Sequence, residues 1–167
     1  MVRRQKARGV TTFVCAATFC CAIATVAIIA DVSGVAAKID PCVVTTMADW
    51  QRGFGRAVKV DGATGNLCSL SLVDASTEDA FFYVSAQKYK SKQRAVAALE
   101  NSRGRSRARK VAGLGDEALY VFNPKNGFDN LSVRDRKVVY TFEAEIHSET
   151  GTPHQNELVT VARAALG

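Results

Sequence analysis

Histidine is scarce in this chain of 167 residues, which removes the commonest ways of building a metal site. Only His147 and His154 are present, and no two cysteines have the Cys-x-x-Cys spacing that zinc sites favour. The serines lie in no nucleophile-elbow pattern, and no serine, histidine and aspartate set stands out. We therefore expect no metal, no cofactor and no catalytic residues, and a protein that is not an enzyme.

Phosphate-binding loops and acidic pairs are also missing. The turn Gly113-Leu114-Gly115 has too few glycines for a phosphate loop and no helix pattern after it. Asp116 and Glu117 follow this turn, but neighbouring strand residues point to opposite faces, so they are poorly placed as a general acid/base couple. We interpret the segment as a turn with a conformational role.

The chain does contain, near its start, 21 residues without charge, from Val10 to Ala30. As a helix this run spans about 31 Å, close to the roughly 30 Å hydrocarbon core of a bilayer. Basic residues precede it and hold the N-terminus in the cytoplasm: Arg3, Arg4, Lys6 and Arg8. The pattern predicts that the cytoplasmic membrane is a partner of the chain and that the rest of the protein is exported.

Two fates of this leader are open. Residues 1–30 are a signal anchor, with 31–39 as a tether and 40–167 as an extracytoplasmic domain of a single-pass membrane protein, or the chain is cleaved near Ala37 and secreted. Lipid attachment is disfavoured because Phe19 spoils the small-residue pattern before Cys20 and Cys21, and all three leader cysteines, Cys15 included, lie inside the apolar run.

Only Cys42 and Cys68 remain outside the leader. In an exported domain two cysteines favour one disulfide. Closing a loop of this length is expected to stabilise the fold by about 3.5 kcal/mol. The bond would tie the first helix to a strand.

Periodicity and turn residues predict an α+β domain after residue 40. Short turns between successive strands indicate an antiparallel sheet of about six to seven strands, with three helices packed on it. A turn is expected at 61–66, and the last helix is expected to have Thr152 as its N-cap and Pro153 at its first position. The predicted elements are a helix capped by Thr45 or Thr46, strands at 57–60, 68–72 and 80–86, a helix after Ser91, strands at 108–111, 118–122, 131–133 and 138–146, and a helix ending at Leu166.

Positive charge gathers between Lys88 and Lys110, where nine basic residues accompany one acid, Glu100. Within this stretch Arg103, Arg105, Arg107 and Arg109 recur at every second position. In a strand, four such guanidinium groups would share one face and form a cationic strip about 20 Å long. Outside the cytoplasm the expected anionic partners are lipid headgroups, wall polymers or an acidic envelope protein, and nucleic acid is not expected. A solvated loop is the alternative reading.

The exported part resembles small secreted or lipid-anchored envelope proteins of unknown function from high-GC Gram-positive bacteria. The motifs that carry the resemblance are Asp40-Pro41-Cys42 before a threonine-capped helix, Cys68 on a strand, the turn from Val111 to Ala118, and the helix from Thr152 to Leu166. The resemblance implies a PsbP-like α+β fold with a central antiparallel sheet, and a binding or accessory role. It supplies no catalytic residues.

Two functions follow. The first is a non-enzymatic envelope domain that binds an anionic surface or a protein partner. The alternative is a carrier of a small apolar ligand held between the sheet and a helix. Its pocket would be lined by Trp50, Phe54, Phe81, Tyr83, Tyr140 and Phe142, although core packing is another use for these residues.

Overall fold

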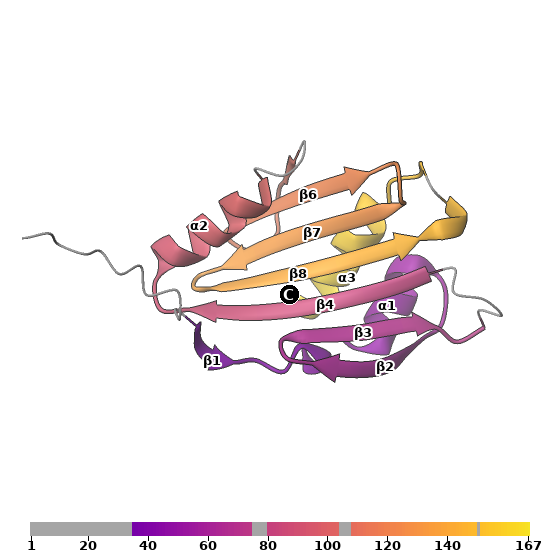
Figure 1. The fold of residues 1–167 in the computed structure, drawn as a ribbon, viewed down its shortest axis with the longest axis horizontal. Coiled ribbons are helices and arrows are strands. Elements are labelled where there is room, and N and C mark those ends of the chain that lie inside the picture. The colour runs from indigo at the N-terminus through magenta and orange to yellow at the C-terminus, as the bar shows by residue number, and fades with distance from the viewer. Residues whose placement is uncertain (1–34, 75–79, 104–107, 150) are drawn as a thin grey trace, which may run out of the picture. The chain divides into compact units, whose positions relative to one another are not determined.

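A computed structural model describes residues 35–74, 80–103, 108–149 and 151–167, and the charge-free run at 10–30 lies outside these ranges. The described residues form the predicted α+β fold, an antiparallel sheet with helices packed on it (Figure 1). Seven strands follow one another in the order β2-β3-β4-β8-β7-β6-β5, and β1 also pairs with β4. Within the described ranges, no helix has the length and apolar character needed to cross a membrane.

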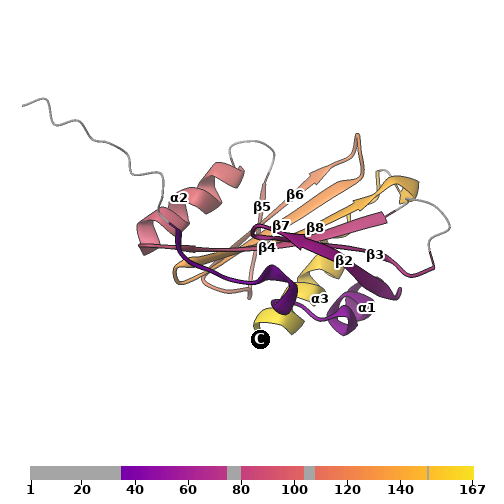
Figure 2. The same ribbon diagram turned by 60° about the horizontal axis from the view of Figure 1, so that its bottom comes forward.

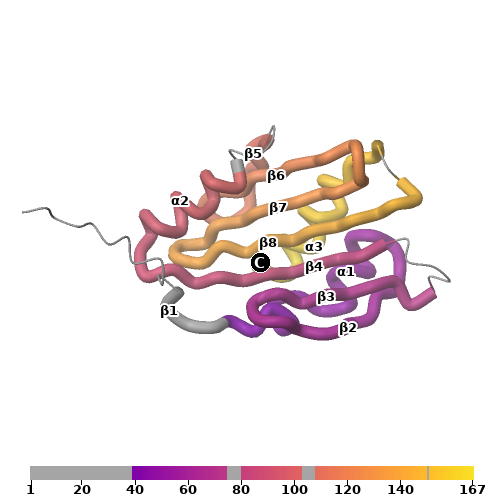
Figure 3. The backbone as a smooth tube through the Cα atoms, in the orientation of Figure 1, coloured from indigo at the N-terminus to yellow at the C-terminus, as the bar shows by residue number. Residues whose placement is uncertain are grey.

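The elements follow the chain in the predicted order after β1: one helix, three strands, a helix, four strands and a helix (Figure 3). The strands are β1 (Val35–Lys38), β2 (Val58–Thr64), β3 (Leu67–Leu72), β4 (Ala80–Tyr89), β5 (Arg109–Val111), β6 (Glu117–Asn123), β7 (Phe128–Asp135) and β8 (Val138–Ile146). The helices are α1 (Met47–Phe54), α2 (Lys92–Arg103) and α3 (Gln155–Leu166), with two short 3-10 helices, η1 (Pro41–Val43) and η2 (His147–Glu149).

The helices cover the two faces of the sheet unequally. Helices α1 and α3 contact each other on one face, and α2 lies alone on the other (Figure 2). Because successive strand residues point to opposite faces, the central strands supply apolar side chains to both sides. The larger core, under α1 and α3, includes the fully buried Trp50, Phe82, Phe142, Leu131 and Leu158. The smaller one, under α2, consists of Ala95, Leu99, Leu119 and Val139.

Helix α1 has complete local signals at both ends. Thr46 and Asp49 form a reciprocal capping box, in which the Asp49 backbone N–H donates to Thr46 Oγ1 at 3.2 Å and the Thr46 N–H donates to Asp49 Oδ2 at 2.8 Å. Gly55 ends the helix in the left-handed conformation with φ 68°. Inside it, Gly53 lets α3 approach closely, because a Cβ there would lie 2.8 Å from the Glu157 carbonyl oxygen.

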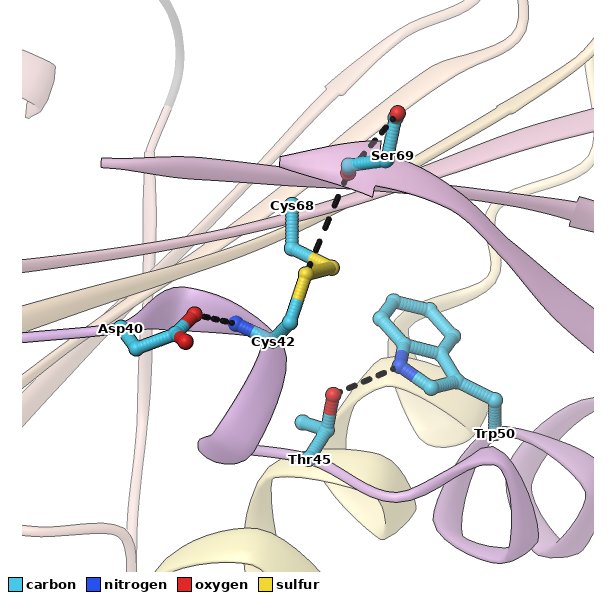
Figure 4. Close-up of a disulfide and its surroundings, with 7 residues drawn as sticks. Asp40, Cys42, Thr45, Trp50, Cys68 and Ser69 are labelled. Atoms are coloured by element: carbon cyan, nitrogen blue, oxygen red, sulfur yellow. Dashed lines mark hydrogen bonds between the residues drawn. A yellow bond between two sulfur atoms is a disulfide. The ribbon is translucent and has the colours of Figure 1, made fainter. Parts of the chain in front are cut away.

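The predicted disulfide between Cys42 and Cys68 is present (Figure 4). It joins η1, directly before α1, to the inward-facing side of β3, with Cα atoms 5.1 Å apart. The Asp40 carboxylate accepts the Cys42 backbone N–H at 3.0 Å and so caps this turn. Beside the disulfide, the buried Trp50 donates its indole N–H to Thr45 Oγ1 at 3.0 Å. The bond therefore holds the N-terminal segment against the main core.

Two boundaries near the N-terminus differ from the predictions. Residues 35–38, which were expected in the tether, form β1. This strand pairs with Gln87 and Tyr89 of β4, past Ser85, where the pairing of β4 with β3 stops. Strand β2 does not stop at Val60 but continues to Thr64, so the turn is shorter than 61–66. Most β2 side chains are exposed at this sheet edge, which is why no apolar alternation marked the extension.

The N-cap predicted for the last helix is wrong. Helix α3 begins at Gln155 with His154 in the cap position and no side-chain cap bond. The reason is a tertiary contact: the buried carboxylate of Asp129 on β7 accepts the His154 backbone N–H at 3.2 Å. This bond fixes the chain at His154, so the local Thr152 signal is not used.

Candidate functional site

An open hollow lies on the α2 face of the sheet, where that helix stops short. A 12-residue helix is about 18 Å long, whereas the 10-residue strand β4 extends over about 33 Å, so α2 leaves part of the face uncovered. The resulting open cleft has a volume of about 560 Å³. It is lined by residues from the end of α2 and from three strands: Asn101, Ser102, Val121, Asn123, Phe128, Asn130 and Glu143.

A chain of hydrogen bonds orders the floor of the cleft. Asn130 Nδ2 donates to Glu143 Oε1 at 2.7 Å, and Ser132 Oγ donates to Asn130 Oδ1 at 3.0 Å. Asn130 and Glu143 face each other directly across β7 and β8. Burial raises the pKa of the Glu143 carboxyl, the hydrogen bond from Asn130 opposes that rise, and Glu145 adds to it. The floor thus presents a fixed carboxyl and a fixed amide.

The lining combines hydrogen-bonding groups with a small apolar surface. Asparagine side chains donate and accept, and the Glu143 carboxylate accepts. Phe128 and Val121 supply apolar contact area beside them. A few oriented polar groups next to an aromatic ring are the usual composition of a site for a polar small molecule or polymer segment.

Sequence reasoning did not identify this cleft. Its one signal was the alternation in β8, which places Thr141, Glu143 and Glu145 on the polar face of a half-buried strand. Nothing in that pattern shows that the end of α2 and the polar positions of β6 and β7 stand opposite Glu143. That arrangement depends on the strand order, in which β7 lies between β8 and β6.

The two described members of the arginine strip, Arg103 and Arg109, lie on different elements. Arg103 is the last residue of α2 and Arg109 is the first residue of β5, so a helix end and a separate strand replace the single strand considered from the sequence. Arg105 and Arg107 lie outside the described residues. A period of two places side chains on one face only within a single strand. Because Arg103 ends a helix, no single strand runs from Arg103 to Arg109. Binding of an anionic partner by these arginines stays a prediction.

Asp116 and Glu117 both form ion pairs with the buried Arg134. Arg134 Nη1 lies 2.5 Å from Asp116 Oδ2, and its Nη2 lies 3.9 Å from Glu117 Oε2. The hydrogen bond from Arg134 lowers the pKa of Asp116, as does the bond from the Arg136 backbone N–H. Gly115 makes room for this arrangement, since a Cβ there would lie 2.6 Å from the Arg134 carbonyl oxygen. The arrangement agrees with a conformational role.

A second polar cluster is buried under α3. The Tyr120 hydroxyl donates to Asp129 Oδ1, which also accepts the His154 backbone N–H. Asp129 is fully buried, its Oδ2 has no hydrogen-bond partner, and burial raises its pKa. Burial, followed by the bond to Asp129, raises the pKa of Tyr120 as well. The bond from Tyr120 joins β6 to β7, and the bond from His154 joins the start of α3 to β7. The cluster therefore orders the core.

The histidines lie apart in the described structure. His154 is buried with Nε2 3.4 Å from Glu149 Oε2, and His147 is exposed with Nε2 3.6 Å from Glu145 Oε1. Among the described residues, no group of three histidine, cysteine or acidic side chains could hold a metal ion.

The aromatic residues considered for an apolar carrier do not line the cleft. Trp50 and Phe142 are fully buried in the core, and Phe54 and Tyr140 pack against it. Trp50, Phe54 and Phe82 form a contiguous group, with ring centroids 4.8 to 5.8 Å apart. Their observed role is packing between α1 and the sheet.

Comparison with known proteins finds no family model, no curated protein and no solved structure that matches this chain, and the family resemblance therefore rests on its short motifs alone.

Proposed function

We propose that this protein is an exported binding domain, attached to the outer face of the cytoplasmic membrane by residues 10–30, which holds a polar segment of a wall polymer in the cleft beside α2. The binding is non-covalent and no reaction is catalysed. The disulfide supports export, since such bonds persist in oxidising compartments. The observation that carries the ligand class is the hydrogen-bonded floor of the cleft, Glu143 with Asn130 and Ser132.

A sugar segment suits this lining better than an apolar ligand. Hydroxyl and acetamido groups can bond to the amides and the carboxylate, while a sugar face can lie on Phe128. An apolar molecule would displace water from the polar atoms of the lining without replacing its hydrogen bonds, at a cost of about 1–3 kcal/mol for each group left unsatisfied.

The test is sedimentation of the full chain with purified cell wall, followed by titration with soluble wall fragments. Glu143→Ala removes the carboxyl and leaves Asn130 Nδ2 without its acceptor, so we expect affinity to fall about tenfold or more. Glu145→Ala is the matched control, because Glu145 lies on the same face of β8, two residues further on, and does not line the cleft. Its affinity should equal that of the unaltered chain.

Glu143→Gln should give an intermediate affinity because its amide oxygen can still accept from Asn130. A chain that does not sediment with the wall, or equal losses for Glu143→Ala and Glu145→Ala, would overturn the cleft as the binding site.

A further inference from the structure

The end of the sheet where β1 enters is surrounded by positive side chains. The end of β4, the start of α2 and the turn between β7 and β8 meet there, and the Tyr89 backbone N–H donates to the Lys137 carbonyl oxygen at 2.8 Å. Six exposed basic residues belong to these segments, and we refer to them as the basic end: Lys88, Lys90, Lys92, Arg94, Arg136 and Lys137. The acidic residues beside them are Asp116, Glu117 and Asp135, and the first two lie against the buried Arg134. Positive charge therefore dominates this end.

The opposite end of the sheet has the reverse balance. Arg56, Lys59 and Lys125 are basic residues at this end, and the acidic residues there are Asp74, Glu145, Glu149 and Glu157. The charge of the described domain is therefore polarised along the strands. Only the tertiary structure shows this, because Arg136 and Lys137 are more than 40 residues from the other members of the basic end.

The turn between β7 and β8 has an unusual composition for its geometry. Two-residue hairpin turns favour Asn-Gly or Asp-Gly because the first position needs a positive φ. Here Arg136 and Lys137 occupy the turn, and Arg136 has φ 53°. The chain keeps two cations at a position where glycine or asparagine would be less strained.

The chain enters the domain at this same end. Val35 of β1 pairs with Tyr89, the last residue of β4, and Lys38 pairs with Gln87. Four residues, 31–34, separate Val35 from the end of the charge-free run at Ala30. Even fully extended, such a connection covers about 17 Å. A membrane-spanning helix over 10–30 would thus hold the basic end within one or two Debye lengths of the headgroups.

We propose that the basic end is a membrane-binding surface whose partner is the anionic lipid headgroups of the membrane that residues 10–30 cross. This inference rests on the attachment put forward under the proposed function. Contact with the headgroups orients the domain, so that the cleft, about 14 Å further along α2 from Lys92, faces away from the membrane and toward the wall.

The experiment uses the full chain in vesicles of neutral phosphatidylcholine, or of the same lipid with about one-third phosphatidylglycerol. Flotation after an alkaline wash reports attachment, which should hold in both lipids. A membrane-impermeant amine reagent then labels exposed lysines, with mass spectrometry as the readout. We expect Lys92 and Lys137 to react about threefold or more slowly in anionic vesicles. Lys59 and Lys125 should react equally in both, and molar salt should remove the difference.

Paired charge reversals test whether the cations are the cause. In the double variant Lys92→Glu with Lys137→Glu, the slower labelling of Lys88 and Lys90 in anionic vesicles should disappear. In the matched variant Lys59→Glu with Lys125→Glu it should remain. All four side chains are exposed, so both variants should fold, and thermal unfolding is the check.

Each outcome separates the two proposals. A chain that leaves neutral vesicles but shows slow Lys92 labelling on anionic ones overturns the anchor and supports the basic end. A chain that stays with both vesicles and labels equally in both overturns the basic end alone. A chain that leaves both vesicles and labels equally in both overturns both.

Discussion

The two faces of the sheet differ in what covers them. Under α1 and α3, one continuous apolar core is closed by Trp50, Phe142 and Leu158, and the disulfide supports its edge. Under α2, four small or medium apolar residues form a minor core, and the cleft beside them is open and lined mainly by polar side chains. The closed face stabilises the fold, because buried apolar area stabilises it, whereas the open face has the polar groups that the proposed recognition needs.

The largest expected difference in the free energy of unfolding comes from replacing one phenylalanine on each face with alanine. Phe142→Ala opens a cavity in the closed core and should lower the free energy of unfolding by about 3–5 kcal/mol. Phe128→Ala, on the half-buried lining of the cleft, should change it by about 1 kcal/mol or less. Chemical denaturation of both proteins measures the difference.

If Phe142→Ala does not fold, Phe142→Leu and Phe128→Leu give the same contrast at smaller amplitude. Equal losses at the two positions would show that the open face contributes to stability as much as the closed one.

A second contrast uses glycine in the α1–α3 contact. Helix propensity alone would make Gly53→Ala stabilising by about 1 kcal/mol. The added Cβ would instead lie 2.6 Å from Val161 Cγ2 and 2.8 Å from the Glu157 carbonyl oxygen, so we expect a net loss of about 1–3 kcal/mol.

Gly62→Ala on the edge strand β2 is the control for this glycine. A Cβ there meets no atom within 4 Å, and thermal unfolding should show little change or a small gain. A stabilised Gly53→Ala protein would mean that α1 and α3 are not in tight contact.

The smallest expected effect concerns two carboxyls with raised pKa values, one on each face. Asp129 on the closed face and Glu143 on the open face both have their pKa raised, chiefly by burial. The folded state therefore binds protons more tightly than the unfolded state, and stability falls as pH rises from the ordinary carboxyl pKa toward the folded value. Asp129→Asn should remove this contribution, so that the variant gains stability relative to the unaltered protein across that acidic interval.

The measurement is the free energy of unfolding at several pH values between about 4 and 7. The slope is diagnostic, because a constant offset reports only the altered hydrogen bonds to Tyr120 and His154. Glu143→Gln should change the slope less, since Glu143 is only half-buried and water screens its charge. A larger change of slope for Glu143→Gln would show that burial shifts the pKa of the open-face carboxyl more than that of Asp129.

Local signals predicted most of the fold. Three local signals act within a few residues, and each is confirmed: a threonine N-cap, which is Thr46, the alternation through Cys68, Leu70 and Leu72, and the helix after Ser91. Predictions were wrong where a distant group decided the outcome. The start of α3 depends on Asp129 from β7, and β2 extends because β3 supplies hydrogen-bonding partners as far as Leu67.

The candidate site was less predictable than the fold, for the same reason. The regular spacing of Arg103, Arg105, Arg107 and Arg109 is a property of the chain, but α2 ends at Arg103 and β5 begins at Arg109. The cleft residues carry no motif, because amides and a carboxylate become a site only when strand order brings them to one place.

By itself, the sequence determined the α+β class, the order of the elements after residue 40 and the pairing of Cys42 with Cys68, because these follow from local periodicity and from cysteine number. Only the tertiary structure decided which polar residues face one another across β7 and β8, and which cations gather where β1 enters. Strand pairing joins segments that are far apart in the chain, and no local pattern records those distances.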